Sequence, residues 1–341
     1  MRTRFGRSRE RAIDRRVVLA VLFWLALEGP TQAGDLELGL PIKCELGRTC
    51  EIQQYVDHGA ASNPKDYRCG TLTYSGHNGT DFRLPTLSAQ RAGVDVLAAA
   101  DGRVLRTRND MPDRLLSEAD TRLVVNRECG NGLIIDHGDR WETQYCHLAQ
   151  GSLRASTGDR VKVGQTIGQV GLSGQTEFPH LHLTVRHLGE VIDPFAFGAP
   201  KGSCGAGQSL WSTSIRNSLS YRARSILNSG FASGPVTMEQ VELGEAGQSS
   251  LGSDAQAIVA FVRAIGLKAG DVQHLSIMGP GGQLLVAHTE PPLDRNRAQS
   301  LLFVGKKKSP LDWPAGRYEA NYQVTHDGEV EIVKVFTVAF D

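Results

Sequence analysis

Hydrophobic residues in the first two thirds of the chain come in short runs separated by glycine and other turn-forming residues. Such runs are typical of short strands, and no long stretch with a helical period interrupts them. Leu133–His137 and Glu142–His147 flank Gly138-Asp139-Arg140, which is a β-hairpin pattern. The segment therefore predicts an antiparallel β domain. Its strand candidates are 94–98, 102–105, 133–137, 142–147 and 181–187, with two short strands joined by glycine corners within 158–168.

The last third repeats the β pattern after a break in composition. Residues 205–235 are rich in Ser, Gly and Asn and have no clear period, so they predict a linker with one short helix near 215–227. The spacing and turn signals that follow predict an immunoglobulin-like β-sandwich over 236–341. Its strand candidates are 257–265, 272–278, 283–288, 301–305, 317–325 and 330–340.

Residues 1–33 have the pattern of a secretory signal peptide. Arg15-Arg16 ends a basic segment, an apolar run from Val17 to Leu27 follows, and Thr31-Gln32-Ala33 resembles a cleavage site. An uncleaved membrane anchor is the alternative, but this run is too short to cross about 30 Å of hydrocarbon. We expect a secreted protein with no stable membrane insertion after cleavage, and a periplasmic location.

The net charge of zero conceals an uneven distribution. Residues 1–33 hold seven of the 37 basic and three of the 37 acidic residues, so 30 basic and 34 acidic residues remain after cleavage. This mildly acidic remainder does not have the basic surface that nucleic-acid binding requires.

Six cysteines lie between positions 44 and 204, and an even number in an exported chain predicts disulfides. Cys44 and Cys50 are close enough for a local bridge around Gly47. The other four allow three connectivities, of which we expect Cys129–Cys146 with Cys69–Cys204. All six precede 205, which predicts a domain boundary there and a first domain at 34–204.

Five histidine and aspartate residues could share one metal site. His77 and Asp81 stand four residues apart with Gly79 between them, and can curl around one ion from a tight loop. His180 and His182 are two apart on a predicted strand and so share a face, while His147 ends the hairpin. Imidazole and carboxylate are usual zinc ligands, and a catalytic site needs three of them and an open position. The two surplus groups could move a proton and stabilise an oxyanion.

The order of these motifs resembles the lysostaphin-like zinc metallopeptidases, which cleave peptide bonds in bacterial peptidoglycan. The resemblance covers about Gly76 to Pro194. The segments that carry it are GHNGTD, VDVLAAADGRV, CGNGLIIDHG with TQYCHL, GDRVKVGQTIGQVGLSG, PHLHL and VIDP.

The resemblance implies a role for each residue. His77, Asp81 and His182 would bind zinc, which lowers the pKa of its water and polarises the scissile carbonyl. His147 and His180 would serve as general base and transition-state stabiliser, in either order. The implied substrate is a peptidoglycan peptide, with stem-peptide cross-links as the bond expected in a periplasm.

Two other readings remain open. An inactive relative would bind the wall or activate an amidase, but that class lacks metal ligands, whereas all five residues are present here. A biotinyl- or lipoyl-carrier domain shares the GDRVKVGQTIG pattern, but Lys162 lies within a strand rather than at an exposed turn. The region after 235 has scattered histidines and no cysteine, so we expect it to be an accessory domain.

Overall fold

The computed structural model describes residues 1–2, 36–60, 62–116, 122–200, 202–309, 311 and 313–340. The predicted signal peptide at 1–33 lies almost wholly outside the described residues. No helix among the described residues has the length and apolar character needed to cross a membrane.

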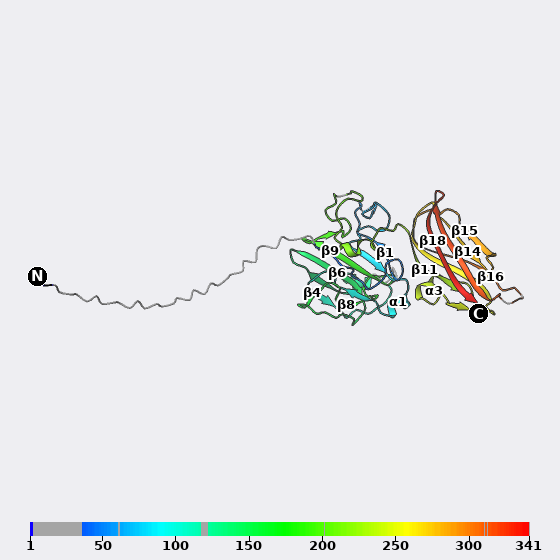
Figure 1. The fold of residues 1–341 in the computed structure, drawn as a ribbon, viewed down its shortest axis with the longest axis horizontal. Helices are drawn as coiled ribbons and strands as arrows, with labels where there is room; N and C mark the ends of the chain where they lie inside the picture. The colour runs from blue at the N-terminus through cyan, green and yellow to red at the C-terminus, as the bar shows by residue number, and fades with distance from the viewer. Residues whose placement is uncertain are drawn as a thin grey trace. The chain divides into compact units, whose positions relative to one another are not determined.

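One large sheet carries the first half of the chain, with strands in the order β1-β2-β9-β6-β5-β4-β7 and β10 paired to β9 (Figure 1). All its pairings are antiparallel, as predicted. Strands β3 (Asp95–Leu97) and β8 (Thr166–Gln169) pair with each other in a separate two-stranded sheet. The strands of the large sheet are β1 (Glu51–Gln54), β2 (Thr80–Arg83), β4 (Gly102–Arg108), β5 (Asn131–Asp136), β6 (Trp141–Leu148), β7 (Arg160–Val161), β9 (His180–His187) and β10 (Glu190–Ile192).

Strand β9 shows why this sheet buries one face. Leu181, Leu183 and Val185 are at most 1% exposed and belong to the first hydrophobic core. Successive side chains on a strand point to opposite faces, so the even-numbered residues of β9 face away from that core. The polar groups His180, His182 and Arg186 lie on this second face.

The last third forms two further sheets, one of β11-β13-β16 and one of β12-β18-β17-β14-β15. Residues from both sheets share one core, including Ile258 of β13 and Tyr322 of β17, so the sheets pack as a sandwich. Among the described strands of these two sheets, β12 and β18 are the one parallel pair. Immunoglobulin-like connectivity remains a prediction. The strands are β11 (Ser225–Ala232), β12 (Ser250–Leu251), β13 (Ala257–Leu267), β14 (Val272–Met278), β15 (Leu284–Thr289), β16 (Arg297–Lys307), β17 (Gly316–His326) and β18 (Glu329–Phe340).

Residues 205–235 contain more structure than a linker requires. Helix α2 (Thr213–Arg216) and strand β11 lie within them. Leu210, Trp211 and Leu219 are at most 4% exposed and belong to the core of the first sheet. The predicted domain boundaries themselves stay a prediction, but Leu210, Trp211 and Leu219 pack in the core of the first sheet, and β11 pairs with β13 of the second β region.

Contacts also join the two β regions through α3 (Met238–Leu243). Arg263 of β13 donates to the carbonyl oxygen of Pro85 and forms an ion pair with Glu242 of α3, at 3.2 Å. Arg83 of β2 lies 3.9 Å from the same carboxylate. Helix α1 (Leu87–Arg91), capped by Thr86, follows β2 on this side.

Three disulfides confirm the expected connectivity. They join Cys44 to Cys50, Cys69 to Cys204 and Cys129 to Cys146. The last bridge ties the segment before β5 to β6, next to His147. Because Cys146 is bonded, it offers no free thiolate to compete for a metal.

Candidate metal centre

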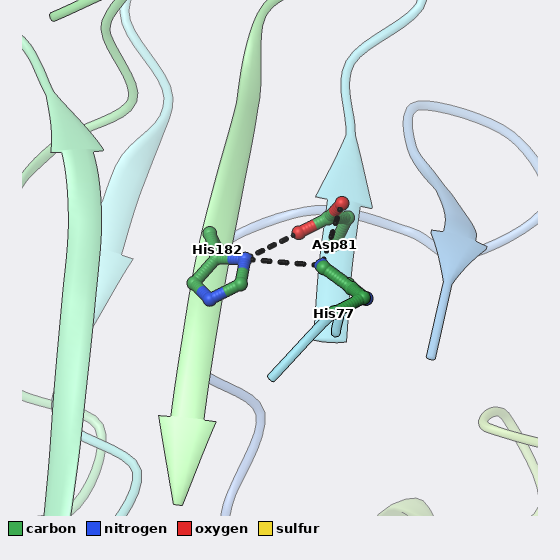
Figure 2. Close-up of side chains that lie close together, drawn as sticks. All are labelled: His77, Asp81 and His182. Carbon is green, nitrogen blue, oxygen red and sulfur yellow. Dashed lines mark hydrogen bonds and ion pairs between the residues drawn. The ribbon is translucent and has the colours of Figure 1, made fainter. Parts of the chain in front are cut away.

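Strands β2 and β9 bring two of the predicted ligands together. The strands pair antiparallel with Asp81 directly opposite His182, and His77 lies in the turn before β2 (Figure 2). Asp81 thus belongs to a strand and not to the tight loop that the sequence suggested. Gly79 permits the approach, because a Cβ there would lie 2.6 Å from His182 Nε2.

The three side chains converge on one point. His77 Nε2 lies 3.2 Å from Asp81 Oδ2 and 3.2 Å from His182 Nδ1, and His182 Nδ1 lies 2.8 Å from Asp81 Oδ1. They form the one group of three or more possible ligands found among the described residues. Zinc–nitrogen bonds of about 2.0 Å at a tetrahedral angle separate two ligands by about 3.3 Å, close to these distances.

Hydrogen bonds on the outer side of each imidazole determine which nitrogen faces the cluster. His77 Nδ1 donates to the carbonyl oxygen of Tyr55 at 2.7 Å, so its Nε2 keeps the lone pair. His182 Nε2 lies 3.0 Å from Asn78 Oδ1 and 3.1 Å from Thr184 Oγ1, which leaves Nδ1 as the acceptor. Outer partners of this kind orient metal-binding histidines. Two lone pairs and a carboxylate facing one point fit a divalent cation.

His147 and His180 lie beside this cluster, and both carry their ring proton on Nδ1. His147 Nδ1 donates to the carbonyl oxygen of Ser173 at 2.9 Å, and His180 Nδ1 donates to that of Phe178 at 2.9 Å. The ring centroids of the two histidines are 4.6 Å apart. His180 Nε2 is 3.6 Å from Asp81 Oδ1. Both Nε2 atoms therefore keep a lone pair near the cluster.

Comparisons with known proteins cover the segment that carries these residues. Residues 75–194 match the model of Peptidase family M23. Among curated proteins of Vibrio cholerae, peptidoglycan DD-endopeptidase ShyA is 29% identical over 141 residues, which cover 41% of this chain and 27% of ShyA. Peptidoglycan DD-endopeptidase ShyC is 32% identical over 120 residues, covering 35% and 22%.

Residues 75–194 belong to peptidase family M23. A solved zinc-containing peptidase from Vibrio cholerae is 26% identical and covers 45% of this chain and 41% of its own, with a TM-score of 0.28. The chain spans about a quarter of the length of the curated relatives described here. All five predicted site residues lie within the M23 segment.

Burial and charge set the protonation of the M23 cluster. Burial raises the pKa of Asp81, but the nearby His180 and His77 outweigh this and hold the pKa well below its ordinary value. Burial lowers the pKa of His77, but Asp81, together with the Tyr55 carbonyl and Asp57, raises it above its ordinary value. Asp81 is thus a carboxylate at neutral pH, as a metal ligand must be.

The pKa values of the two flanking histidines are lowered, whereas that of His77 is raised. Burial, followed by repulsion from His180 and His182, holds the pKa of His147 well below its ordinary value. Burial also lowers the pKa of His180. Both rings are therefore neutral near pH 7, and a neutral Nε2 can accept a proton.

The side-chain direction of His147 could not be predicted from strand alternation. Regular alternation would point Cys146 and His147 to opposite faces, yet both line one hollow. His147 has a left-handed φ of 63°, which is uncommon for a residue other than glycine. Its N–H donates to the carbonyl oxygen of Cys129 at 2.8 Å, and its own carbonyl accepts from Gly171 N–H at 2.9 Å. These bonds hold the bend that turns the imidazole toward the cluster.

Two hollows open beside the cluster. One, of about 420 Å³, is bordered by the disulfide Cys129–Cys146 and by Arg186 of β9. The other, of about 320 Å³, is bordered by Leu116 and Phe178. His147 and His182 line both hollows. An extended chain could therefore lie on either side of the cluster.

Sequence reasoning missed the partners that orient the site. They are the carbonyl oxygens of Tyr55, Ser173 and Phe178. A backbone carbonyl is present at every position, so no residue type signals its role. His137, on the predicted hairpin, lies 2.7 Å from Asp101 O and 2.7 Å from Thr143 Oγ1, outside the cluster.

Proposed function

We propose that this chain is a zinc-dependent endopeptidase that hydrolyses peptide bonds in bacterial peptidoglycan, with stem-peptide cross-links as its target. The observation that carries the proposal is the convergence of His77 Nε2, Asp81 and His182 Nδ1 beside two neutral histidines. Membership of family M23 and the names of ShyA and ShyC support the substrate class.

The three converging groups are the proposed zinc ligands. Bound zinc supplies a Lewis acid and lowers the pKa of a coordinated water. Asp81 keeps its charge because neighbouring imidazoles outweigh the effect of burial on its pKa. His77 and His182 keep their lone pairs on the cluster because their other nitrogens are engaged.

His147 and His180 are the proposed acid–base pair. Each holds its proton on Nδ1 against a backbone carbonyl and presents a free Nε2 near the cluster. One Nε2 accepts the proton of the attacking water, and the resulting imidazolium can pass it to the leaving amine. The other Nε2, after taking up a proton from solvent, donates it to the oxygen that gains negative charge. The geometry suits either order.

An inactive wall-binding or amidase-activating module is the second candidate. That class is expected to have lost ligands, while this chain has the full set and an outer hydrogen bond on each ring. The active enzyme is the better account of these residues. Action on peptidoglycan requires an extracytoplasmic location, which agrees with the proposed secretion to a periplasm.

Digestion of purified peptidoglycan tests this proposal. The protein should release fragments whose masses correspond to cut peptide cross-links, and a chelator should stop the release until zinc is restored. Asp81→Ala serves as the matched protein control. Fragments that appear equally with the chelator or with the control variant would contradict a zinc enzyme. Intact peptidoglycan under all conditions would favour the inactive module.

A further inference from the structure

The hollow beside the disulfide contains one arginine. Apart from histidines, its charged lining residues are Glu128 and Arg186. Arg186 lies on the face of β9 that also carries His180, His182 and Thr184, because these positions are two residues apart. Four residues of strand place Arg186 about 13 Å from His182, the length of about four extended peptide residues.

Arg186 lies near two possible partners, Glu142 and Gln144, but bonds to only one of them in the described structure. Glu142 of β6 lies directly opposite it in the sheet, yet no ion pair within 4.0 Å joins these two described residues. Instead, Arg186 donates from Nη1 to Gln144 Oε1 at 2.8 Å. A guanidinium has five N–H donors. No other hydrogen bond or ion pair of Arg186 occurs within the described part of the chain.

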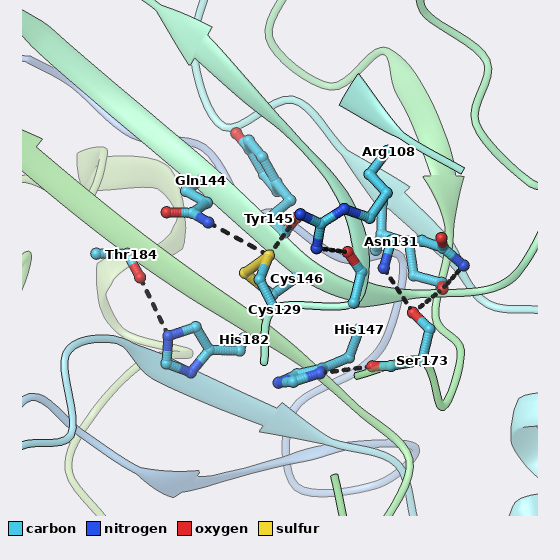
Figure 3. Close-up of a disulfide and its surroundings, with 12 residues drawn as sticks. Arg108, Cys129, Asn131, Gln144, Tyr145, Cys146, His147, Ser173, His182 and Thr184 are labelled. Carbon is cyan, nitrogen blue, oxygen red and sulfur yellow. Dashed lines mark hydrogen bonds between the residues drawn. A yellow bond between two sulfur atoms is a disulfide. The ribbon is translucent and has the colours of Figure 1, made fainter. Parts of the chain in front are cut away.

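Gln144 is itself held in place. Its Nε2 donates to Sγ of Cys129, 3.3 Å away, and this sulfur is bonded to Cys146 (Figure 3). The disulfide therefore orients the amide, and the amide orients the guanidinium along the wall of the hollow. Burial lowers the pKa of Arg186, with Glu142 opposing the shift. The guanidinium stays charged at neutral pH, because arginine remains protonated in proteins.

We propose that Arg186, oriented by Gln144 and the Cys129–Cys146 disulfide, binds a free carboxylate of the peptide substrate. This inference rests on the proposed function and names a feature of its substrate: a carboxylate within about four residues of the bond that is cut. Guanidinium and carboxylate form paired, charge-assisted hydrogen bonds, which are stronger in a half-buried position than in open water. Arg186 is a specificity residue and takes no part in the chemical step.

Glu128 lines the same hollow and could pair with Arg186 in place of a substrate carboxylate. One of its carboxylate oxygens, Oε1, accepts from Asn126 N–H at 2.8 Å. The acid therefore has a backbone partner of its own, and it forms no ion pair with Arg186 in the described structure. Arg186 is left as the charged group of this wall with spare donors.

Matched substrates separate recognition from chemistry. The probes are a cross-linked peptide dimer released from peptidoglycan and the same dimer with its carboxylates converted to methylamides. For the wild type, the amidated dimer should have a KM about tenfold higher with little change in kcat, as expected for loss of one charge-assisted pair. Arg186→Gln should treat both dimers alike, with wild-type zinc content. Arg160→Gln, an exposed arginine on β7, is the matched control and should keep the wild-type preference.

Two further measurements keep the test decisive. Arg186→Lys keeps the charge without the paired donors, so its preference for the carboxylate dimer should be intermediate. This variant provides the test if Arg186→Gln does not fold. Calorimetric binding of both dimers in the presence of a chelator does not depend on cleavage. Cleavage of neither dimer by the wild type would count against the proposed function, while tighter binding of the carboxylate form would still support the subsite. An unchanged preference in Arg186→Gln, or an equal loss on both dimers, would overturn it.

Discussion

Asp81 faces a different imidazole with each of its oxygens. Oδ2 lies 3.2 Å from His77 Nε2 and Oδ1 lies 2.8 Å from His182 Nδ1. The Asp81 side chain is 3% exposed. If it were removed, water could not take its place on a metal ion without entering a buried site, which costs free energy. At the scale of single residues, this carboxylate should have the largest effect on metal binding.

We therefore expect Asp81→Ala to lose most of its zinc, because a three-ligand site rarely tolerates the loss of one. The measurement is zinc content per chain after dialysis against a weak chelator. Asp136→Ala, an acid on β5 away from the cluster, is the control and should keep the wild-type content. Full zinc occupancy in Asp81→Ala would exclude the proposed ligand set.

His147→Ala and His180→Ala should each lower kcat by two or more orders of magnitude, as loss of a general base or an oxyanion donor does. Zinc content should remain, because neither residue is a proposed ligand. His137→Ala provides a control on the same hairpin. Activity within a few-fold of wild type in either site variant would remove that residue from the mechanism.

His58 and Asp193 form a pair outside the metal cluster, with His58 Nε2 2.7 Å from Asp193 Oδ2. The hydrogen bond to Asp193 raises the pKa of His58, against the effect of burial. A raised pKa in the folded state adds stability that is complete below the ordinary histidine pKa of about 6.5 and disappears as pH rises through the folded value.

Accordingly, His58→Gln should lower the free energy of unfolding by about 2 kcal/mol at pH 5.5, and by less at pH 9. Denaturant unfolding of both proteins at the two pH values measures the difference. A difference that grows with pH would contradict the assigned ion pair.

At the scale of elements, the disulfides close loops of very different lengths. The bonded cysteines are separated by 6, 17 and 135 positions for Cys44–Cys50, Cys129–Cys146 and Cys69–Cys204. A cross-link restricts the unfolded chain more when its loop is longer. Their contributions to stability should therefore follow that order.

Replacing each pair by serines should cost about 2, 3 and 5 kcal/mol respectively, on the loop-entropy estimate. Chemical denaturation of the three double variants measures the order. The middle variant also tests the carboxylate subsite, because Gln144 loses its sulfur partner and the preference for the carboxylate dimer should weaken. A largest loss in the Cys44–Cys50 variant would contradict the entropic account.

At the scale of the whole molecule, the segment after the last cysteine completes the first core. Trp211 is 1% exposed, and its ring centroid lies 6.2 Å from that of Phe82 on β2. Leu38 bridges to Trp211 along the backbone. Strand β2, which carries the proposed ligand Asp81, therefore packs against residues that the sequence alone placed in a linker.

A chain shortened at 205 should fail to fold stably, because it loses Leu210, Trp211 and Leu219 from the core. A chain shortened at 223 keeps all three and should bind zinc and cleave small cross-linked peptides. Circular dichroism melting and zinc content compare the two. If the shorter chain melts like the longer one, this segment is dispensable. Loss of small-peptide cleavage in a folded, zinc-loaded 223 chain would show that the second β region contributes to the active groove and is not an accessory.

The β class, most strand positions and the five residues of the proposed site could be predicted from the sequence alone. Side chains alternate between the two faces of any β-strand. The sequence alone therefore places Leu181, Leu183 and Val185 on one face, and His180 and His182 on the other. The disulfide pairing was narrowed to three choices, of which the expected one is present. The ligand roles proposed for His77, Asp81 and His182 came from resemblance to a family.

How these residues meet depends on the three-dimensional fold. Strand β2 was missed because Thr80-Asp81-Phe82-Arg83 has too many polar groups to suggest a strand buried on both faces, as its burial shows. The pairing of Asp81 with His182 joins positions 101 residues apart, and the left-handed turn at His147 depends on hydrogen bonds to Cys129 and Gly171. Such contacts arise from register and backbone bonding between distant strands, which a one-dimensional pattern of side chains does not encode.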